Sequence, residues 1–284
     1  MSYNNLTKLF RYVNANGDSI TFDFLGGFLI NKPVGIDTLS VNLSQAQGIN
    51  QIGATVQSIN IQPRPVTITG YLVGDDQALK KEKLLSVVRP DLGGKLYAGD
   101  YYIDVYPTAT PTIEFKTHLA LFQFSLLAAY PYWRKGNSAT VMLSGINNLF
   151  RFPWNISREY QFGEWSETQF VNVRNDGQVP VPFTATFTAS DTVVNPRITN
   201  AKTGKNLLIN KTMVNGERLT VEITHERTRV TSSVDGDCRG ALSLSSTLFR
   251  LDVGDNVFKP EAAEGLKNMR VNISFATEIV GIAL

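Results

Sequence analysis

Residues 64–106 read RPVTITGYLVGDDQALKKEKLLSVVRPDLGGKLYAGDYYIDVY, and we expect the first half of the chain to be built around this stretch. It predicts a strand, one short helix and a returning strand. The segment from Arg64 to Val73 alternates apolar and polar side chains, a pattern typical of a half-buried strand. Gly74 interrupts the strand, and Leu96 to Tyr106 is expected to form the returning strand.

The helix is expected over about residues 75–88. Asp75 or Asp76 can cap its first free amide groups, and a carboxylate suits the positive end of the helix dipole. Pro90 ends the helix because the residue before a proline is pushed out of the helical region. An apolar stripe follows one side of the helix: Ala78, Leu84, Leu85 and Val88. On this register a charge at Leu85 would be buried, and we expect the stripe to pack on a sheet.

The composition favours a strand-rich globular chain. Its 284 residues suffice for one large or two ordinary domains, and 43% hydrophobic with 18% charged residues argues against wholesale disorder. Threonine, valine, isoleucine and aromatic residues are abundant, which favours strands. The net charge of +2 and the lack of a long basic run give no indication of specific nucleic-acid recognition.

The compartment is indicated by the single cysteine and by the N-terminal sequence. Cys238 cannot form an intrachain disulfide, which fits folding in a reducing cytoplasm. Residues 1–18 lack the apolar core of about 7–15 residues that a signal peptide needs. No window approaches the roughly 18 apolar residues of a membrane span, so no membrane insertion is expected.

Two further regions set the expected domain organisation. Residues 119–129 read LALFQFSLLAA and predict a strand buried on both faces, with a buried helix as the alternative. The following YPYWRKG marks the end of a first domain. Beyond it, short strands separated by turn signals, such as 183–189 and 219–224, predict a sandwich or jelly roll. We therefore expect an N-terminal domain at 1–134 and a C-terminal domain at 135–284.

Side chains suited to catalysis or metal binding are sparse. His118 and His225 lie far apart, and neither has a second histidine or cysteine at ligand spacing, so a zinc site is not expected. Cys238 next to Arg239 could be reactive, but the Asp-Gly sequence before it favours a hairpin tip. Phosphate-binding and dinucleotide-binding glycine motifs are absent. We expect no catalytic residues, no cofactor, no metal and no enzymatic activity.

The aromatic residues around Trp154 and Trp165 are the best candidates for ligand binding. Exposed aromatic rings can stack on sugars, as they do on other apolar faces. The competing and favoured interpretation is that these rings fill the seam between the two domains, since Trp and Tyr bury a large area and satisfy one polar group.

Several segments together resemble one known family, the distal tail proteins (Dit family) of long, non-contractile-tailed phages of Gram-positive hosts and their prophages. In the first half these are FRYVNANGDSITF (10–22), PRPVTITGYLVGDDQALKKEKLLSVV (63–88), GGKLYAGDYYIDV (93–105) and FQFSLLAAYPYW (122–133). In the second half they are VNVRNDGQVPVPFTATF (171–187), PRITNAKTGKNL (196–207), NGERLTVEI (215–223) and RVNISF (270–275). The resemblance implies a mainly β chain: an N-terminal β-sandwich-like domain with one α-helix, then a galectin-like or jelly-roll β-sandwich.

The same resemblance implies a structural role at the tail tip or baseplate of the virion, after folding in the host cytoplasm. The family forms a homo-hexameric ring that joins the major tail tube protein to the tail-associated (lysin or fibre) protein and carries receptor-binding proteins. The polar segment Ser44 to Gly53 is our expectation for an extended arm that contacts neighbouring subunits. The alternative function is a carbohydrate-binding adsorption module that recognises host cell-surface glycans through Trp154 or Trp165.

Overall fold

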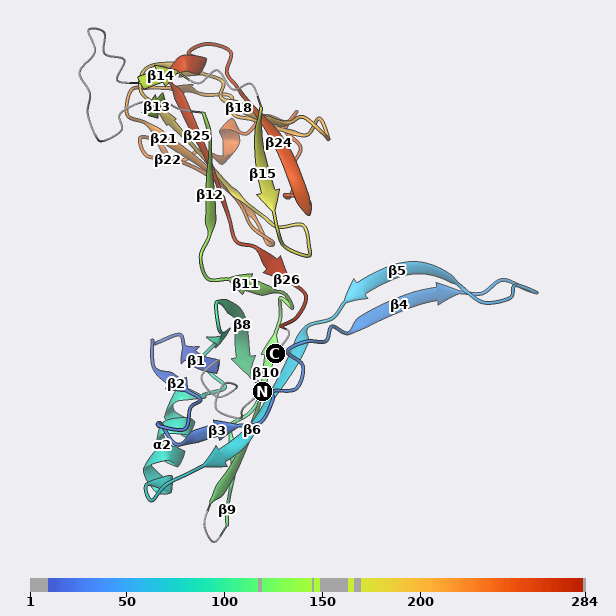
Figure 1. The fold of residues 1–284 in the computed structure, drawn as a ribbon. Helices are drawn as coiled ribbons and strands as arrows, with labels where there is room; N and C mark the ends of the chain where they lie inside the picture. The colour runs from blue at the N-terminus through green and yellow to red at the C-terminus, as the bar shows by residue number, and fades with distance from the viewer. Residues whose placement is uncertain (1–9, 117–118, 145, 149–162, 166–169, 283–284) are drawn as a thin grey trace, which may run out of the picture. The chain divides into compact units, whose positions relative to one another are not determined.

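The structure is a computed structural model that describes residues 10–116, 119–144, 146–148, 163–165 and 170–282. The chain divides into two compact units, one formed by Met1–Gly136 with Glu278–Leu284 and the other by Asn137–Thr277 (Figure 1). Each unit has its own cluster of buried hydrophobic side chains.

The first unit is a β structure with one helix. Its main path of paired strands runs β2-β1-β7-β8-β10-β6-β3, while β9, β11 and β26 pair beside that path. The elements are β1 (Phe10–Asn14), β2 (Ser19–Thr21), β3 (Phe28–Ile30), β6 (Arg64–Leu72), α2 (Gln77–Val87), β7 (Gly94–Ala98), β8 (Tyr101–Pro107), β9 (Thr112–Phe115), β10 (Ala120–Ala128), β11 (Trp133–Lys135) and β26 (Glu278–Ile279). Two further strands, β4 (Val41–Ala46) and β5 (Thr55–Ile61), pair with each other and with no other strand in the described ranges.

Strand β6 and helix α2 follow the predicted order, and α2 is the one α-helix of the described residues. The alternation in β6 is confirmed, since Val66, Ile68 and Leu72 are fully buried. The details of the helix differ from the prediction. The helix begins at Gln77, and the side chain of Asp76, although at the capping position, makes no capping hydrogen bond.

The predicted apolar stripe of α2 is confirmed at Leu84 and Val88 but not at Leu85 and Ala78. Leu84, Val87 and Val88 are buried, whereas Leu85 is only partly buried and Ala78 is exposed. The helix buries its last turn against the sheet and leaves its first turn in solvent. A pattern of apolar residues shows which side of a helix is apolar, but the tilt of the helix on the sheet decides which of them are covered.

The predicted return strand from Leu96 to Tyr106 is two strands. β7 and β8 form a hairpin in which Ala98 lies opposite Tyr101, and Gly99 takes a positive φ of 59° in the turn. Glycine adopts this conformation without steric cost. The Gly-Asp pair inside the apolar run was therefore a turn signal, and reading the run as continuous was wrong.

The apolar run at 119–129 is strand β10, and the helix alternative is wrong. β10 pairs with β6 from Ala120 opposite Leu72 to Ala128 opposite Arg64. Alternate residues are buried, including Phe122 and Phe124, while Leu127 is 37% exposed. The prediction of a strand buried on both faces is therefore wrong, since β10 is fully buried on one face only.

The last residues of the chain return to the first unit, which differs from the expected second domain at 135–284. Trp133 in β11 lies opposite Ile279 in β26. The buried guanidinium of Arg64 donates hydrogen bonds to the carbonyl oxygens of Pro131, at 2.7 Å, and Gly35, at 2.8 Å, and also to that of Val280. Because a buried guanidinium needs several acceptors, Arg64 ties three distant segments together.

The second unit is a β-sandwich, as predicted for the second half. A six-stranded sheet, β12-β25-β16-β21-β22-β23, and a four-stranded sheet, β15-β24-β18-β19, contribute to one core that includes Phe187 and Phe258. The strands are β12 (Ala139–Ser144), β13 (Ile146–Asn148), β14 (Gly163–Trp165), β15 (Val171–Asn175), β16 (Thr184–Ala189), β17 (Val193–Val194), β18 (Arg197–Asn200), β19 (Asn206–Leu208), β20 (Thr212–Met213), β21 (Arg218–Ile223), β22 (Thr228–Ser232), β23 (Gly236–Asp237), β24 (Gly254–Glu261) and β25 (Met269–Phe275). Two 3-10 turns, Arg239–Ala241 and Leu266–Asn268, complete it.

Candidate interaction surfaces

The structure does not bring together the described residues that were candidates for catalysis, metal binding or ligand binding. Among the described residues no group of three or more histidine, cysteine or carboxylate side chains could hold a metal ion. His225 lies in the turn between β21 and β22, and Cys238 follows the β22–β23 hairpin and is partly buried. His118 and Trp154 lie outside the described residues, as does the side chain of Trp165. The choice between sugar binding and a domain seam for the two tryptophans stays a prediction.

One structural finding concerns the expected lack of membrane insertion. Within the described ranges, no helix combines the length and apolar character that crossing a bilayer requires.

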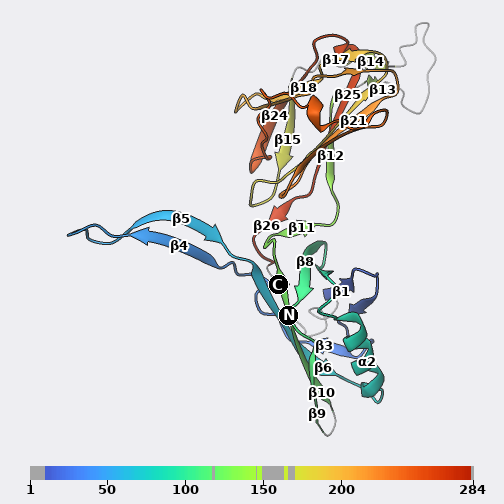
Figure 2. The ribbon, with the colours of Figure 1, turned by 180° about the vertical axis from the view of Figure 1, so that it is seen from behind.

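The most prominent surface feature of the first unit is the β4–β5 hairpin, which we call the arm (Val41–Ile61). Figures 1 and 2 show it extending away from the rest of the first unit. Every residue of both strands is exposed. The predicted arm, Ser44 to Gly53, covers only the distal half of one strand and the tip. The return strand β5 was not predicted, although Gly53 and Pro63 flank it in the sequence.

The two faces of the arm differ in chemistry. On one face Val41 lies opposite Ile61, and Leu43 lies opposite Ile59. On the other face the cross-strand pairs are Asn42 with Asn60 and Ser44 with Ser58. Residues directly opposite each other in an antiparallel pair project to the same side. The base of the arm is therefore an amphipathic ribbon with one continuous apolar face.

This apolar face is open to solvent in the single chain. The exposed fraction is 49% for Leu43 and 65% for Ile59, and Ile49 and Ile52 at the tip are fully exposed. The two-stranded ribbon also has unpaired backbone edges, since β4 and β5 pair with no other strand of the described residues. An isolated two-stranded ribbon is marginally stable in water, and exposed edges and apolar side chains favour association with another chain.

The root of the arm is fixed to the core of the first unit. Gln62 N donates to Ser40 O at 2.9 Å, which closes the base of the ribbon. Arg64 follows two residues later and holds the start of β6 through its three carbonyl acceptors. The arm thus projects from a rigid base, which would fix the direction in which its apolar face is presented.

On a second surface, formed by strands β1, β7, β8 and β11, the cationic and aromatic side chains contact one another. The guanidinium of Arg11 lies 4.9 Å from the ring centre of Tyr97, and Tyr97 packs on Tyr102 at 5.9 Å. Lys95 and Arg134 approach the Tyr102 ring at 4.3 and 5.1 Å. Such cation–π pairs stabilise a sheet surface by themselves. This face therefore gives weaker evidence of a missing partner than the arm does.

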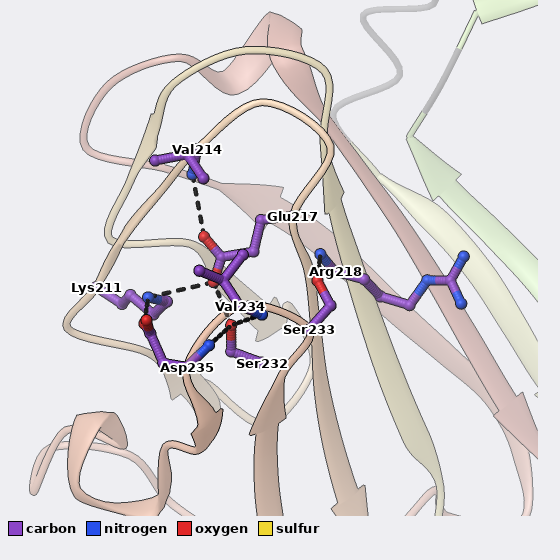
Figure 3. Close-up of polar contacts among 8 residues, drawn as sticks. All are labelled: Lys211, Val214, Glu217, Arg218, Ser232, Ser233, Val234 and Asp235. Atoms are coloured by element: carbon purple, nitrogen blue, oxygen red, sulfur yellow. Dashed lines mark hydrogen bonds and ion pairs between the residues drawn. The ribbon is translucent and has the colours of Figure 1, made fainter.

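In the second unit, a polar network centred on Glu217 joins the turn before β21 to the β22–β23 hairpin (Figure 3). The buried Glu217 carboxylate accepts hydrogen bonds from Ser232 Oγ and, at 3.1 Å, from Val214 N. Lys211 Nζ lies 3.2 Å from Glu217 and also pairs with Asp235. Burial raises the pKa of Glu217, but the hydrogen bonds from Ser232, Val214 and Lys211 outweigh it and hold the pKa below its usual value.

Glu217→Gln is expected to destabilise the second unit by about 2 kcal/mol at neutral pH, because hydrogen bonds to a buried charged group are lost. The folded-state pKa lies below the unfolded-state value of about 4.3, so this stability is present above pH 4.3 and disappears as the pH falls toward the folded-state pKa. The unfolding temperatures of the unmodified protein and the variant, measured at several pH values, should therefore converge in acid. Glu226→Gln, at an exposed position, is the control. If the difference in unfolding temperature between Glu217→Gln and the unmodified protein does not narrow in acid, the stabilising role of the ionised Glu217 carboxylate is contradicted.

Comparison with known proteins found a family model that matches the second unit and solved structures with a similar fold. Residues 176–277 match the family model described as the siphovirus-type tail component, C-terminal domain. No curated protein matches the chain significantly.

Solved structures match nearly the full length. The crystal structure of the SPP1 Dit (gp 19.1) protein, described as a paradigm of the hub adsorption apparatus in phages that infect Gram-positive bacteria, matches with a TM-score of 0.71 at 15% identity, over 95% of this chain and 99% of that one. A chain of the phage P2 baseplate in its activated conformation with Ca matches with a TM-score of 0.52 at 10% identity, over 96% and 99% of the two chains. The mainly β fold and the resemblance to the distal tail proteins are thus confirmed.

Proposed function

We propose that this protein is a structural hub of a phage tail tip, assembled as a homo-hexameric ring. The family match of the second unit and the Dit-like fold of the whole chain support a tail or baseplate role. The observation that carries the proposal of self-assembly is the arm, whose apolar face and backbone edges have no partner within the described chain.

The arm is suited to a contact between copies of the chain. It projects from the first unit, while Phe24, Leu25 and Val34 of the same unit are themselves 62–91% exposed and could receive an apolar ribbon. An arm that binds a different surface of the next copy makes a head-to-tail contact. Such a contact repeats around a ring if the rotation between copies closes, and the rigid root of the arm would set that rotation.

The further partners follow from the resemblance. One side of the ring would bind the major tail tube protein, the opposite side the tail-associated protein, and the second unit would carry receptor-binding proteins. The titles of the similar structures describe a hub and a baseplate in those phages. The corresponding location is the tail tip of the virion, and the role is structural and not catalytic.

The test is the mass of the full-length protein in solution, by light scattering or native mass spectrometry, with negative-stain imaging. We expect a species of six times the mass of one chain, or a stack of two such rings, with six-fold views. A protein that stays monomeric at tens of micromolar, both alone and with the tail tube protein, would overturn the proposal.

A further inference from the structure

A pocket of about 370 Å³ lies in the second unit, away from the Glu217 network. Three segments distant in sequence line it. The turn between β21 and β22 contributes residues 224–228, the 3-10 turn contributes Arg239, and the stretch before β24 contributes residues 248–250. A pocket of this size is within the range of small-ligand sites.

The lining of this pocket is rich in arginine. Arg227, Arg239 and Arg250 all line it, against one carboxylate, Glu226. Within the described part of the chain, none of the three guanidinium groups makes an ion pair or a side-chain hydrogen bond. By contrast, Arg134 and Arg197 are paired with carboxylates. Three arginines against one carboxylate give the lining of this pocket a net positive charge, which favours the binding of an anion.

The backbone around these arginines is held in place. Thr224 Oγ donates to Arg227 O at 2.8 Å and accepts from Arg227 N at 3.0 Å, which fixes the turn. Arg239 N donates to Asp237 Oδ1 at 3.0 Å. Phe249 is buried against Phe183, with ring centres 5.2 Å apart, and so positions Arg250 beside it.

The floor of the pocket is apolar. Ile223 and Phe249 are almost fully buried, while Leu248 is 50% exposed. The pocket therefore combines a positively charged lining with a surface suited to the carbon skeleton of a ligand.

We propose that this pocket binds a phosphate group carried on a sugar or polyol. Guanidinium groups bind phosphate and carboxylate oxygens through paired N–H donors. A phosphate offers more oxygens than a carboxylate, so it can engage three arginines at once. The apolar floor would contact the carbons of the attached sugar or polyol. The proposal is independent of ring assembly, since all the lining residues belong to the second unit.

The test is ligand-observed NMR on the full-length protein, with glycerol 3-phosphate as the probe and glycerol, inorganic phosphate and hexaglutamate as comparisons. We expect saturation transfer to glycerol 3-phosphate that weakens as salt is raised. The double variant Arg227→Gln with Arg250→Gln should lower the affinity at least tenfold. Arg270→Gln, which removes an exposed arginine of β25 outside the pocket, should change it less than twofold.

Each outcome bears on the proposal. Because the substituted arginines are exposed, the variants should keep their unfolding temperatures, and loss of binding with an unchanged unfolding temperature supports the site. Absence of saturation transfer, or equal affinity in the double variant, overturns it. Tighter binding of hexaglutamate would assign the pocket to an acidic protein segment instead. If inorganic phosphate bound as tightly as glycerol 3-phosphate, the pocket would recognise the phosphate group alone, and the proposed contact with a sugar or polyol would be wrong.

Discussion

Leu84→Asp is expected to leave the first unit unfolded. Leu84 is fully buried where the last turn of α2 packs on the sheet. The substitution removes a buried side chain and places a carboxylate in an apolar site, at a cost of about 5 kcal/mol or more. Whole domains are stable by only about 5–15 kcal/mol. Calorimetry of the purified variant should therefore lose the transition of the first unit, and the soluble yield should fall sharply.

Leu79→Asp is the matched control, because Leu79 lies on the same helix and is 68% exposed. This variant should unfold within a few degrees of the unmodified protein, since exposed substitutions change stability by about 0.5 kcal/mol or less. Leu85→Asp should fall between the two, as Leu85 is only partly buried. If Leu85→Asp proved more damaging than Leu84→Asp, the register of the helix on the sheet would be wrong.

Replacing residues 43–59 of the arm by a short glycine-containing turn is expected to abolish ring assembly and leave the chain folded. The strands of the arm are exposed throughout and contribute nothing to the core of the first unit. The unfolding temperature should therefore change little. Light scattering should show a monomer at concentrations at which the unmodified protein is a ring.

A pair of point variants tests whether assembly depends on the apolar face of the arm or only on the presence of the arm. Ile59→Lys places a charge on the apolar face, and Asn60→Lys places the same charge on the polar face one residue away. Burying an isoleucine at an interface contributes about 1.5–3 kcal/mol, so Ile59→Lys should weaken each subunit contact at least tenfold. Asn60→Lys should assemble nearly normally. Equal effects of the two variants would show that the apolar face is not the contact surface.

The sequence alone predicted those features that depend on neighbouring residues. The alternation in β6, the position of the single helix and the sandwich of the second half all follow from side-chain periodicity and turn residues. The errors arose where a local pattern had more than one solution. The Gly99-Asp100 turn was hidden inside an apolar run, and the length of the arm depended on the pairing of β4 with β5.

The candidate surfaces were less predictable than the fold. The arm was expected only over Ser44 to Gly53, which covers part of β4 and the tip, and the arginine pocket was not expected at all. Arg227, Arg239 and Arg250 are spread over 24 positions of sequence and show no spacing that would mark a common site. Their convergence requires the β21–β22 turn, the 3-10 turn and the anchor of Phe249 to be placed by the sandwich core.

Local patterns in the sequence were therefore enough to predict the β-rich class, strand β6 and the helix that follows it, because period-2 and helical patterns act over a few residues. Tertiary contacts, by contrast, account for the return of the last residues to pair with β11 and for the burial of Arg64 among carbonyl groups from three segments. Those contacts join residues up to 216 positions apart. Their stability comes from satisfying buried polar groups at long range, which no local pattern of side chains encodes.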